Sequence, residues 1–304
     1  MVYCECIHPE RKKFFMRDVF IVNPTAGAGY ALKVMEKLES VLKSRNADYA
    51  VLRTERPGHA TDLARAAAAE KDVRAVISVG GDGTAFEVAS GLAGTGMPLG
   101  IIPAGTGNDF IKAAGLPKDP LQALETVLRH SPKPVDMGRL NEGSFLNVCG
   151  TGFDVTVLDN AESLKSRFKG LLPYFLGLLK AIAHYRPVHL KLRTDGAEEE
   201  GDYLICSVAN GQYIGGGIPI CPAADITDGK LNLVTVKNVP RYKIPLYLPG
   251  LMVGRVLGFK ITSHRQVKEI SFEGQGLRVN IDGEILPMDR ASFAVRPGVL
   301  QLLQ

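Results

Sequence analysis

The chain has 304 residues, enough for one large domain or two ordinary ones, and 45% of them are hydrophobic while 22% are charged. This composition is typical of a soluble globular protein with a sizeable core. The formal net charge of +4 fits an anionic substrate or an anionic membrane surface, but it is too small to indicate a nucleic-acid partner.

The cysteines and the N-terminus indicate the cellular compartment in which we expect the protein. Five scattered cysteines predict no disulfide framework and fit a reducing cytoplasm. Cys4 and Cys6, with His8 nearby, would form half of a metal site, but no second pair of ligands follows at zinc spacing. The N-terminus has no continuous apolar region, so we expect no secretory signal, and no stretch reaches the roughly 18 apolar residues of a spanning helix.

The first 130 residues alternate between apolar strands and helical patterns. Strands are predicted at 18–22, 49–53, 73–79 and 99–102, and helices at 31–43, 61–70, 87–92 and 120–129. Thr61 is the expected N-cap of the second helix, and Asp119-Pro120 begins the fourth. The alternation predicts a parallel sheet covered on both faces, with ligands at the carboxyl ends of its strands.

Strand-like runs dominate the second half of the chain, at 145–149, 188–193, 203–209, 230–236, 269–272, 277–281 and 292–295. Turn signals such as Asp228-Gly229 and Asp282-Gly283 separate them, which predicts an antiparallel sandwich or barrel-like domain. Two mostly apolar segments, 168–183 and 244–259, are interpreted as helices that cover this domain. Contact with a membrane interface is the alternative.

A glycine-rich turn, Gly80-Gly81-Asp82-Gly83-Thr84, follows the predicted strand 73–79. Glycines let a backbone approach a phosphate because no Cβ obstructs it, and the N–H groups of the turn and of the next helix then point at the anion. Asp82 would repel a bare phosphate, so its expected role is with Mg²⁺ or with a hydroxyl proton. A plain strand-to-helix turn is the alternative interpretation.

Two further small-residue turns follow predicted strands: Asn23-Pro24-Thr25-Ala26-Gly27 and Gly105-Thr106-Gly107-Asn108-Asp109. Since the carboxyl ends of parallel strands share one edge, the three turns would form a crevice, with Asp109 near Asp82. Asn108 and Asp109 can also cap the short helix 110–114. The Walker A, protein-kinase and Rossmann patterns are absent.

Three motifs, taken in order, resemble those of the diacylglycerol kinase catalytic-domain family. They are Asn23-Pro-x-Ala-Gly27, GGDGT at 80–84 and Gly105-Thr-Gly-Asn-Asp-Phe110. That family includes bacterial diacylglycerol and related lipid kinases, sphingosine kinases and ceramide kinases. The resemblance covers nearly the whole chain from about residue 18, through 145–154, 210–211, 224–231 and 282–284. NAD kinases share GGDGT, so the GTGNDF segment discriminates better. Ala85-Phe86 departs from the usual Leu-Asn and removes a polar contact at position 86.

The resemblance implies an ATP site between two domains. Residues 17–136, completed by the C-terminal segment 292–304, would form an α/β nucleotide-binding domain with a parallel sheet. Residues 137–291 would form an antiparallel β-sandwich domain for the lipid substrate. The residues expected to meet ATP are Asn23, Pro24, Thr25, Ala26, Gly27, Thr54, Gly81, Asp82, Gly83, Thr84, Glu87, Thr106 and Asn108.

The same resemblance assigns catalytic and metal roles. Asp82 and Asp109 would belong to a Mg²⁺–water network, and Glu284 would be the general base that takes the proton of the lipid hydroxyl. A structural Mg²⁺ would be held by the side chains of Asp225 and Asp228 and the carbonyl of Lys230, which are suitable hard oxygen ligands. On the residues alone, Glu284 is a solvated strand end after a two-residue hairpin turn, and Asp225 and Asp228 are turn residues.

The resulting expectation is an ATP- and Mg²⁺-dependent lipid kinase of phospholipid biosynthesis. Its predicted reaction is transfer of the γ-phosphate to diacylglycerol, giving phosphatidic acid. We expect a cytoplasmic protein, peripheral at the inner face of the membrane, with no nucleic-acid partner; a homodimer is left open. An NAD kinase-like enzyme and a nucleotide-binding regulatory module without turnover are the alternatives.

Overall fold

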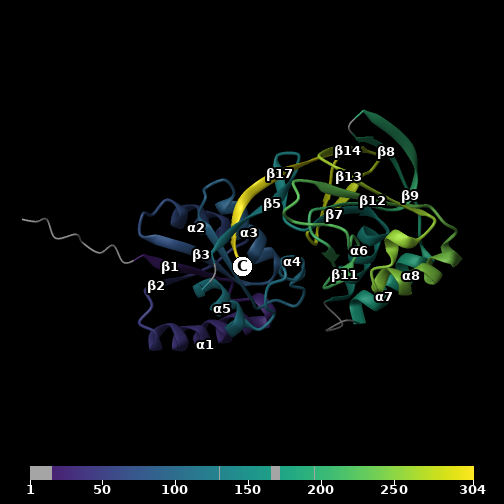
Figure 1. The fold of residues 1–304 in the computed structure, drawn as a ribbon. Helices are drawn as coiled ribbons and strands as arrows, with labels where there is room; N and C mark the ends of the chain where they lie inside the picture. Colours follow the sequence, from purple (N-terminus) through teal and green to yellow (C-terminus); the bar gives the residue numbers. More distant parts are fainter. Residues whose placement is uncertain (1–15, 130, 166–171, 195) are drawn as a thin grey trace, which may run out of the picture.

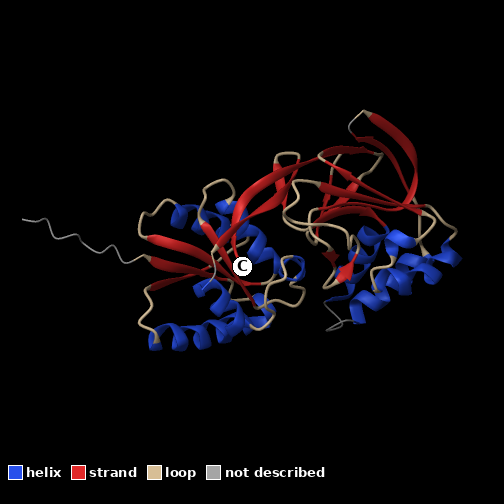
Figure 2. Cartoon of the chain, viewed as in Figure 1, coloured by secondary structure: helices blue, strands red, loops and turns tan. Residues whose placement is uncertain are grey.

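A computed structural model describes residues 16–129, 131–165, 172–194 and 196–304. The Cys4-x-Cys6 pair and residues 168–171 of the first apolar segment therefore lie outside the described residues. Figure 1 shows two lobes side by side, and Figure 2 shows that sheet and helix contribute to both. The predicted fold class, an α/β part followed by an antiparallel β-sandwich part, is confirmed.

The N-terminal lobe is built on four parallel strands in the order β2-β1-β3-β4. The buried residues of β1 alternate between its two faces, as the two-residue period of a strand requires. Val19 and Ile21 pack with α2 and α3, whereas Phe20 and Val22 pack with α1 and α5. The bounds are β1 Arg17–Val22, β2 Tyr49–Arg53, β3 Val73–Gly80, β4 Pro98–Pro103, α1 Tyr30–Ser44, α2 His59–Ala68, α3 Asp82–Leu92, α4 Asp109–Ala113 and α5 Pro120–Arg129.

Helix starts differ in how well the sequence predicts them. Asp119 caps α5 as expected, because its Oδ1 accepts hydrogen bonds from the N–H groups of Leu121 and Gln122 at 3.1 and 3.0 Å. The prediction that Thr61 caps α2 is wrong. That helix begins at His59, after Gly58, and Thr61 donates its hydroxyl to the Glu87 carbonyl at 2.8 Å.

The C-terminal lobe is an antiparallel assembly with helices on one side (Figure 2). One core lies between its strands, and a second lies between the strands and helices α6 to α8. The bounds are β6 Gly143–Phe145, β7 Val148–Gly152, α6 Phe153–Lys165, α7 Leu172–Ala183, β8 Val188–Thr194, β9 Ala197–Ala209, β10 Tyr213–Ile214, β11 Ile218–Pro219, β12 Leu231–Lys237, α8 Ile244–Met252, β13 Thr262–Val267, β14 Glu269–Glu273, β15 Arg278–Ile281 and β16 Glu284–Pro287.

Two long strands run from one lobe into the other: β5 (Pro132–Leu140) and β17 (Arg290–Leu303). They pair antiparallel with each other, and the register shifts between Arg296 and Leu300. One end of β17 pairs with β14, and its other end pairs in parallel with β4 (Figure 1). Since both strands are continuous across the lobes, the domain boundaries at 136, 137, 291 and 292 stay a prediction.

A buried carboxylate fixes this crossing. Asp136 on β5 is 2% exposed, and its Oδ1 and Oδ2 accept hydrogen bonds from the N–H groups of Gly298 and Gly229, both at 2.7 Å. Gly298 lies in the shifted part of β17, and Gly229 lies in the turn before β12. One side chain therefore satisfies the backbone of two segments at the point where the strands change lobe.

We predict that Asp136→Ala lowers the free energy of unfolding by roughly 2–6 kcal/mol, because two buried N–H groups would each lose their acceptor. Urea unfolding monitored by circular dichroism would measure this loss. Asp48→Ala, at an exposed position before β2, is the matched control and should cost less than about 0.5 kcal/mol. Equal losses in the two variants would contradict the role given to Asp136.

Candidate active site

The three predicted turns meet at the carboxyl edge of the parallel sheet. The turn after β1 is tied to the glycine loop, because Asn23 Nδ2 donates a hydrogen bond to Thr84 Oγ1 at 3.2 Å. Asn23 Oδ1 in turn accepts from the N–H and the hydroxyl of Thr25, at 3.1 and 2.9 Å. A Cβ on Gly27 would lie 2.4 Å from the Ala104 carbonyl oxygen, so this turn also packs against the end of β4.

The second and third turns touch backbone to backbone. A Cβ on Gly105 would lie 2.3 Å from Gly81 Cα, and one on Gly107 would lie 2.7 Å from Asp82 Oδ2. Glycine is required here because of close approach, which is the property that the sequence predicted for a phosphate-binding turn.

Helix α3 begins directly in the glycine loop, with Gly81 as its N-cap. The N–H groups of its first turn have no partner within the helix, so they and the helix dipole can bind an anion there. A Cβ on Gly83 would meet no heavy atom within 4 Å, so the backbone of this first turn is open to a ligand. The geometry thus supports a phosphate at the start of α3.

Asp82 joins the glycine loop to the third turn. Its Oδ1 accepts a hydrogen bond from the N–H of Phe110 at 3.2 Å. Burial raises the pKa of Asp82, and the nearby negative charge of Asp109 raises it further, while hydrogen bonds from backbone N–H groups partly offset both effects. Two carboxylates that repel each other in this way fit a site that holds a cation between them and phosphate oxygens.

Asp109 connects the third turn to the C-terminal lobe. It is 7% exposed; its Oδ1 lies 3.1 Å from Lys112 Nζ, and its Oδ2 accepts a hydrogen bond from the N–H of Gly216 at 2.8 Å. Lys112 also donates to the Gly107 carbonyl at 2.9 Å. Asn108 Nδ2 donates to the Gly105 carbonyl at 3.1 Å, so this side chain holds the turn and makes no capping hydrogen bond to α4.

The other predicted ATP contacts are placed differently. Both carboxylate oxygens of Glu87 accept backbone hydrogen bonds, from Gly58 at 2.9 Å and Ala60 at 3.0 Å, so this side chain holds the start of α2. Thr54 follows β2 and donates its N–H to the Val22 carbonyl at 2.9 Å. Thr106 is exposed at the tip of the third turn.

The hairpin that carries Glu284 is confirmed. Ile281 pairs with Glu284 across a two-residue turn in which Asp282 and Gly283 have φ values of 48° and 106°. Glu284 is exposed. Burial raises the pKa of Asp282 to about 6, and the negative charge of Asp82 contributes to that rise. The hairpin therefore lies within electrostatic reach of the glycine loop, on the opposite lobe.

The predicted structural metal ligands lie in the loop before β12. Asp225 Oδ1 accepts from the N–H and hydroxyl of Thr227, and Asp228 Oδ1 accepts from the N–H of Lys230. Burial raises the pKa of Asp228, and the charges of Asp225 and Asp136 raise it further. This mutual repulsion fits a cation site, although no cluster of three or more His, Cys, Asp or Glu side chains suited to a metal occurs in the described part of the chain.

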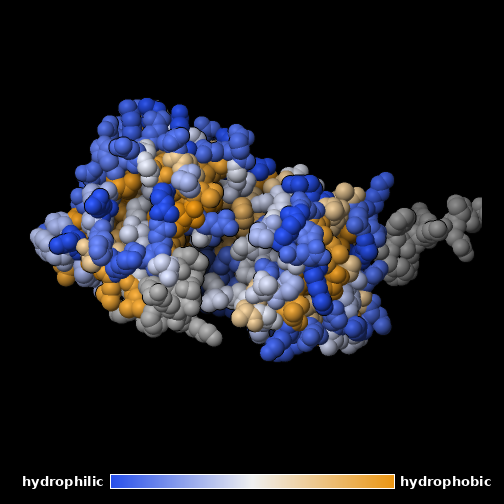
Figure 3. All heavy atoms as spheres, turned by 180° about the vertical axis from the view of Figure 1, so that it is seen from behind, coloured by the Kyte–Doolittle hydropathy of each residue, from blue (hydrophilic) through white to orange (hydrophobic). Residues whose placement is uncertain are grey.

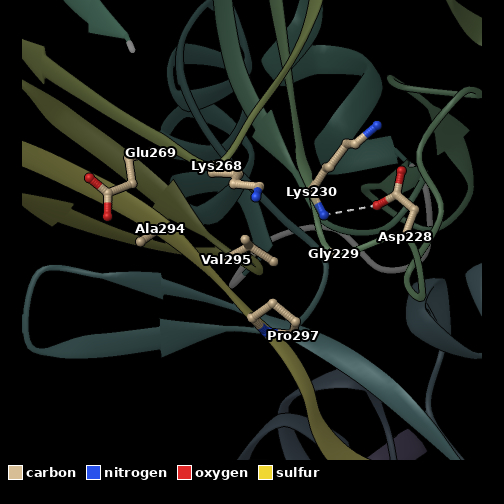
Figure 4. A pocket seen from close by; sticks show the side chains of 8 residues that line it. All are labelled: Asp228, Gly229, Lys230, Lys268, Glu269, Ala294, Val295 and Pro297. Atoms are coloured by element: carbon tan, nitrogen blue, oxygen red, sulfur yellow. Dashed lines mark hydrogen bonds between the residues drawn. The ribbon is translucent and has the colours of Figure 1, made fainter.

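Two hollows lie away from the glycine turns. An open groove of about 480 Å³ lies at the strand crossing (Figure 4), lined by Asp228, Gly229, Lys230, Lys268, Glu269, Ala294, Val295 and Pro297. A second, wholly apolar pocket lies beneath α8, lined by Phe153, Leu204, Ile205, Val236, Ile244, Tyr247, Leu248, Leu251, Val256 and Phe259. The groove contains no residue of the three turns, so it is separate from the candidate phosphate site.

Sequence reasoning missed several residues that hold the site and the strand crossing together: Lys112, Asp136, Asn147 and the run Gly215-Gly216-Gly217. It treated Asp282 only as a turn residue. All three glycines of that run have positive φ, at 61°, 88° and 122°. Three consecutive glycines are visible in the sequence and could have indicated a loop that approaches another backbone closely. The partners of the buried polar side chains are far away along the chain and left no such signal.

Comparison with known proteins agrees with this geometry. The family model of the diacylglycerol kinase catalytic domain matches residues 17–140, and that of the YegS C-terminal NAD kinase beta sandwich-like domain matches residues 147–304. A curated "Diacylglycerol kinase" of Mycobacterium tuberculosis is 33% identical over 93% of this chain and 94% of its own length. The chain belongs to the diacylglycerol kinase family. It is accordingly a lipid kinase, a phosphotransferase with an alcohol acceptor.

Further relatives support the family assignment. A "Probable lipid kinase YegS-like" protein of Pseudomonas putida is 34% identical over 75% of this chain and 76% of its own length. Two solved structures from Bacillus anthracis str. Sterne, one described as that of a diacylglycerol kinase, superpose with TM-scores of 0.77 and 0.69 at 29% and 25% identity. Each covers 96% of this chain and 98% of the solved chain.

The backbone contact between the two glycine turns leads to a prediction. Gly105→Ala should lower the free energy of unfolding by about 1–3 kcal/mol, because its Cβ would overlap the Gly81 backbone. Gly83→Ala is the matched control, since its Cβ would enter open space, and it should leave stability unchanged or slightly higher. Urea unfolding of both variants checks this, and an equally stable Gly105→Ala variant would refute the contact.

Proposed function

We propose that this lipid kinase transfers the γ-phosphate of ATP to the hydroxyl of diacylglycerol, giving phosphatidic acid. The observation that carries the proposal is that three turns and the start of α3 meet at one edge of the sheet, while the charge of Asp82 acts on Asp282 in the Glu284 hairpin of the other lobe. The turns and the helix supply backbone N–H groups for phosphates, and the hairpin supplies a carboxylate on the acceptor side.

The roles we propose for the donor site follow from what each residue can contact. Gly81, Gly83 and Thr84 would bind phosphate oxygens through the backbone of the loop and of α3, and the turn Asn23 to Gly27 would bind the nucleotide beside them. Thr54, Glu87, Thr106 and Asn108 would border the same site. Phosphoryl transfer needs little beyond positioning and charge stabilisation, which these fixed dipoles provide.

Mg²⁺ is the cofactor that the carboxylates fit. Asp82 and Asp109 would hold it at the donor site, and Asp225, Asp228 and the Lys230 carbonyl would hold a structural ion. When bound, Mg²⁺ supplies neutralisation of the negative charge on the phosphoryl group. Within this chain, Lys112 keeps Asp109 oriented, because it contacts both that carboxylate and the Gly107 carbonyl.

Glu284 is proposed as the general base. Its carboxylate is exposed at the start of β16, so it is accessible to a hydroxyl group brought by a substrate. Asp282, the nearest carboxylate along the chain, is unsuited to that task, because its oxygens accept three backbone hydrogen bonds. A positioned base contributes about 10²–10⁴-fold to the rate.

Family membership supports a lipid acceptor, because the matching relatives are named diacylglycerol kinase or lipid kinase, which favours diacylglycerol over the NAD kinase-like alternative. The apolar pocket beneath α8 does not add to this argument, since its volume of about 20 Å³ is too small for an acyl chain.

We predict that Glu284→Gln lowers kcat for diacylglycerol phosphorylation by roughly 10²–10⁴-fold while the ATP dissociation constant changes less than about twofold, because the base contacts the acceptor only. Transfer of labelled γ-phosphate to diacylglycerol, a sphingoid base, a polyprenol and NAD in parallel would measure this and identify the acceptor. Full activity of the variant would exclude the base assignment. Labelling of NAD alone would favour the alternative enzyme, and labelling of no acceptor would favour a regulatory module.

We also propose that the enzyme is cytoplasmic and peripheral at the inner membrane face, and that it binds an anionic bilayer through the outer faces of α7, the turn Arg241–Lys243 and α8. None of the helices in the described ranges is long and apolar enough to cross a membrane. In α8 the residues Tyr247, Leu248 and Leu251 line the apolar pocket, whereas Leu246 is 76% exposed on the opposite side. A surface helix that is apolar all round needs a second apolar neighbour.

Charge complementarity supports an anionic bilayer as that neighbour. Residues 229–268 contain no Asp or Glu, and the exposed apolar side chains there are flanked by exposed cations. The exposed apolar members in that range are Tyr242, Leu246, Met252 and Val253, and the cations are Arg241, Lys243, Arg255 and Lys260. On α7, Leu179 and Lys180 are exposed as well. Figure 3 shows apolar surface at the end of the molecule where α7 and α8 lie. Each cation near an anionic surface contributes about 1 kcal/mol.

The expected effect of Leu246→Glu combined with Met252→Glu is at least about a tenfold weaker partition onto vesicles that contain phosphatidylglycerol, because two apolar contacts become charges. Vesicle sedimentation measures it, and phosphorylation of a short-chain soluble diacylglycerol should be retained. Leu121→Glu, at a 42% exposed position on α5 of the other lobe, is the control. Unchanged partition of the double variant would exclude this face.

A further inference from the structure

The carboxylate of Asp282 binds a separate segment of the C-terminal lobe. Its Oδ2 accepts the N–H of Leu146 at 2.6 Å, and its Oδ1 accepts the N–H groups of Asn147 and Val148 at 3.0 and 2.9 Å. Its own N–H donates to the Val148 carbonyl at 3.2 Å. A two-residue hairpin turn needs none of these contacts, so the carboxylate serves the placement of the hairpin.

The other side of the hairpin is also fixed. Asn280 Oδ1 accepts the N–H of Gly283 at 2.9 Å. With Asp282 held from one side and Gly283 from the other, the backbone that leads into Glu284 has both of its turn residues anchored. The position of the Glu284 carboxylate therefore depends on the segment 146–148.

The segment 146–148 also holds the hairpin of β10 and β11, whose turn contains Gly215, Gly216 and Gly217. Asn147 Nδ2 donates to the Tyr213 carbonyl of β10 at 2.5 Å, and the Asn147 carbonyl accepts the N–H groups of Asn210 and Gly211, both at 2.8 Å. Directly after β10, Gly216 donates its N–H to Asp109 in the donor turn. A continuous series of hydrogen bonds thus joins the hairpin of the base to the turn of the donor site.

We propose that Asp282 is a positioning residue. It clamps the β15–β16 hairpin to the segment 146–148, and so holds Glu284 at a fixed position relative to the donor turn that Gly216 contacts. This inference rests on the proposed role of Glu284. A misplacement of about 1 Å at a reacting group can cost on the order of 10²-fold in rate, so a clamp of this kind has a large effect on turnover.

Asp282→Asn is the conservative test. The amide keeps one oxygen, which can retain the N–H groups of Asn147 and Val148, but its NH₂ group would face the N–H of Leu146. We expect kcat for diacylglycerol to fall about tenfold, with the ATP dissociation constant unchanged within about twofold. Asp289→Asn, at an exposed position just beyond β16, is the matched control and should leave both values unchanged.

A double-mutant cycle separates positioning from general loss of structure. If Asp282 acts through Glu284, adding Asp282→Asn to Glu284→Gln should lower the residual rate by less than about twofold, because the group to be positioned is already inactive. A full tenfold loss in that background would overturn the proposal, since the damage would then be independent of the base.

The cycle also separates this proposal from the proposed function. If Glu284→Gln alone keeps full activity, the base assignment fails, whatever Asp282 does. If Glu284→Gln is impaired and Asp282→Asn matches the Asp289→Asn control, the base assignment stands and the clamp is refuted. Thermal unfolding of each variant, with the expected Tm of Asp282→Asn above the assay temperature, ensures that the rates compare folded proteins.

Discussion

The turns after β3 and β4 touch backbone to backbone, and the arrangement of the candidate site depends on this contact. Gly105 has no room for a side chain, because its Cβ would lie 2.3 Å from Gly81 Cα, and a Cβ on Gly81 would lie in tight contact, 3.3 Å from Gly105 Cα. The approach brings Asp109 close to Asp82, and the pKa of Asp82 is raised first by burial and then by the negative charge of Asp109. It also leaves the start of α3 and the third turn facing the same space, where a phosphate and its counter-ion can be held together.

Buried or part-buried carboxylates that accept backbone N–H groups recur at three places where distant segments meet. Asp136 accepts a backbone N–H at the strand crossing, and Asp109 accepts that of Gly216 from the opposite lobe. Asp282 accepts the N–H of Asn147, just before β7. Such charge-assisted hydrogen bonds are stronger than neutral ones, and they depend on the backbone of the partner and not on its side chain. Glycine is the donor at the first two of these junctions, which lets the two chains come close.

The sequence alone predicted the parallel sheet, the glycine turns and the Glu284 hairpin, because each is encoded locally. Each of these signals extends over only a few residues: the spacing of apolar side chains, a glycine at the end of a strand, and Asp-Gly between two strands. The contacts of Asp136 and Asp282 could not be predicted, since their partners lie up to 162 residues away. Glu87 shows a different limit: the family resemblance implies an ATP contact, but no sequence pattern indicates that both of its oxygens accept N–H groups at the start of α2.

The crossing strands also determine how the two lobes are joined. β5 pairs with β17 along nearly the whole length of β5, and the two strands form a ribbon that resists shear between the lobes. The ladder is interrupted between Arg296 and Leu300, where the Asp136 carboxylate bonds to Gly298 in place of strand pairing. At this point the connection between the lobes therefore depends on one side chain, whereas elsewhere along the ribbon it depends on backbone hydrogen bonds.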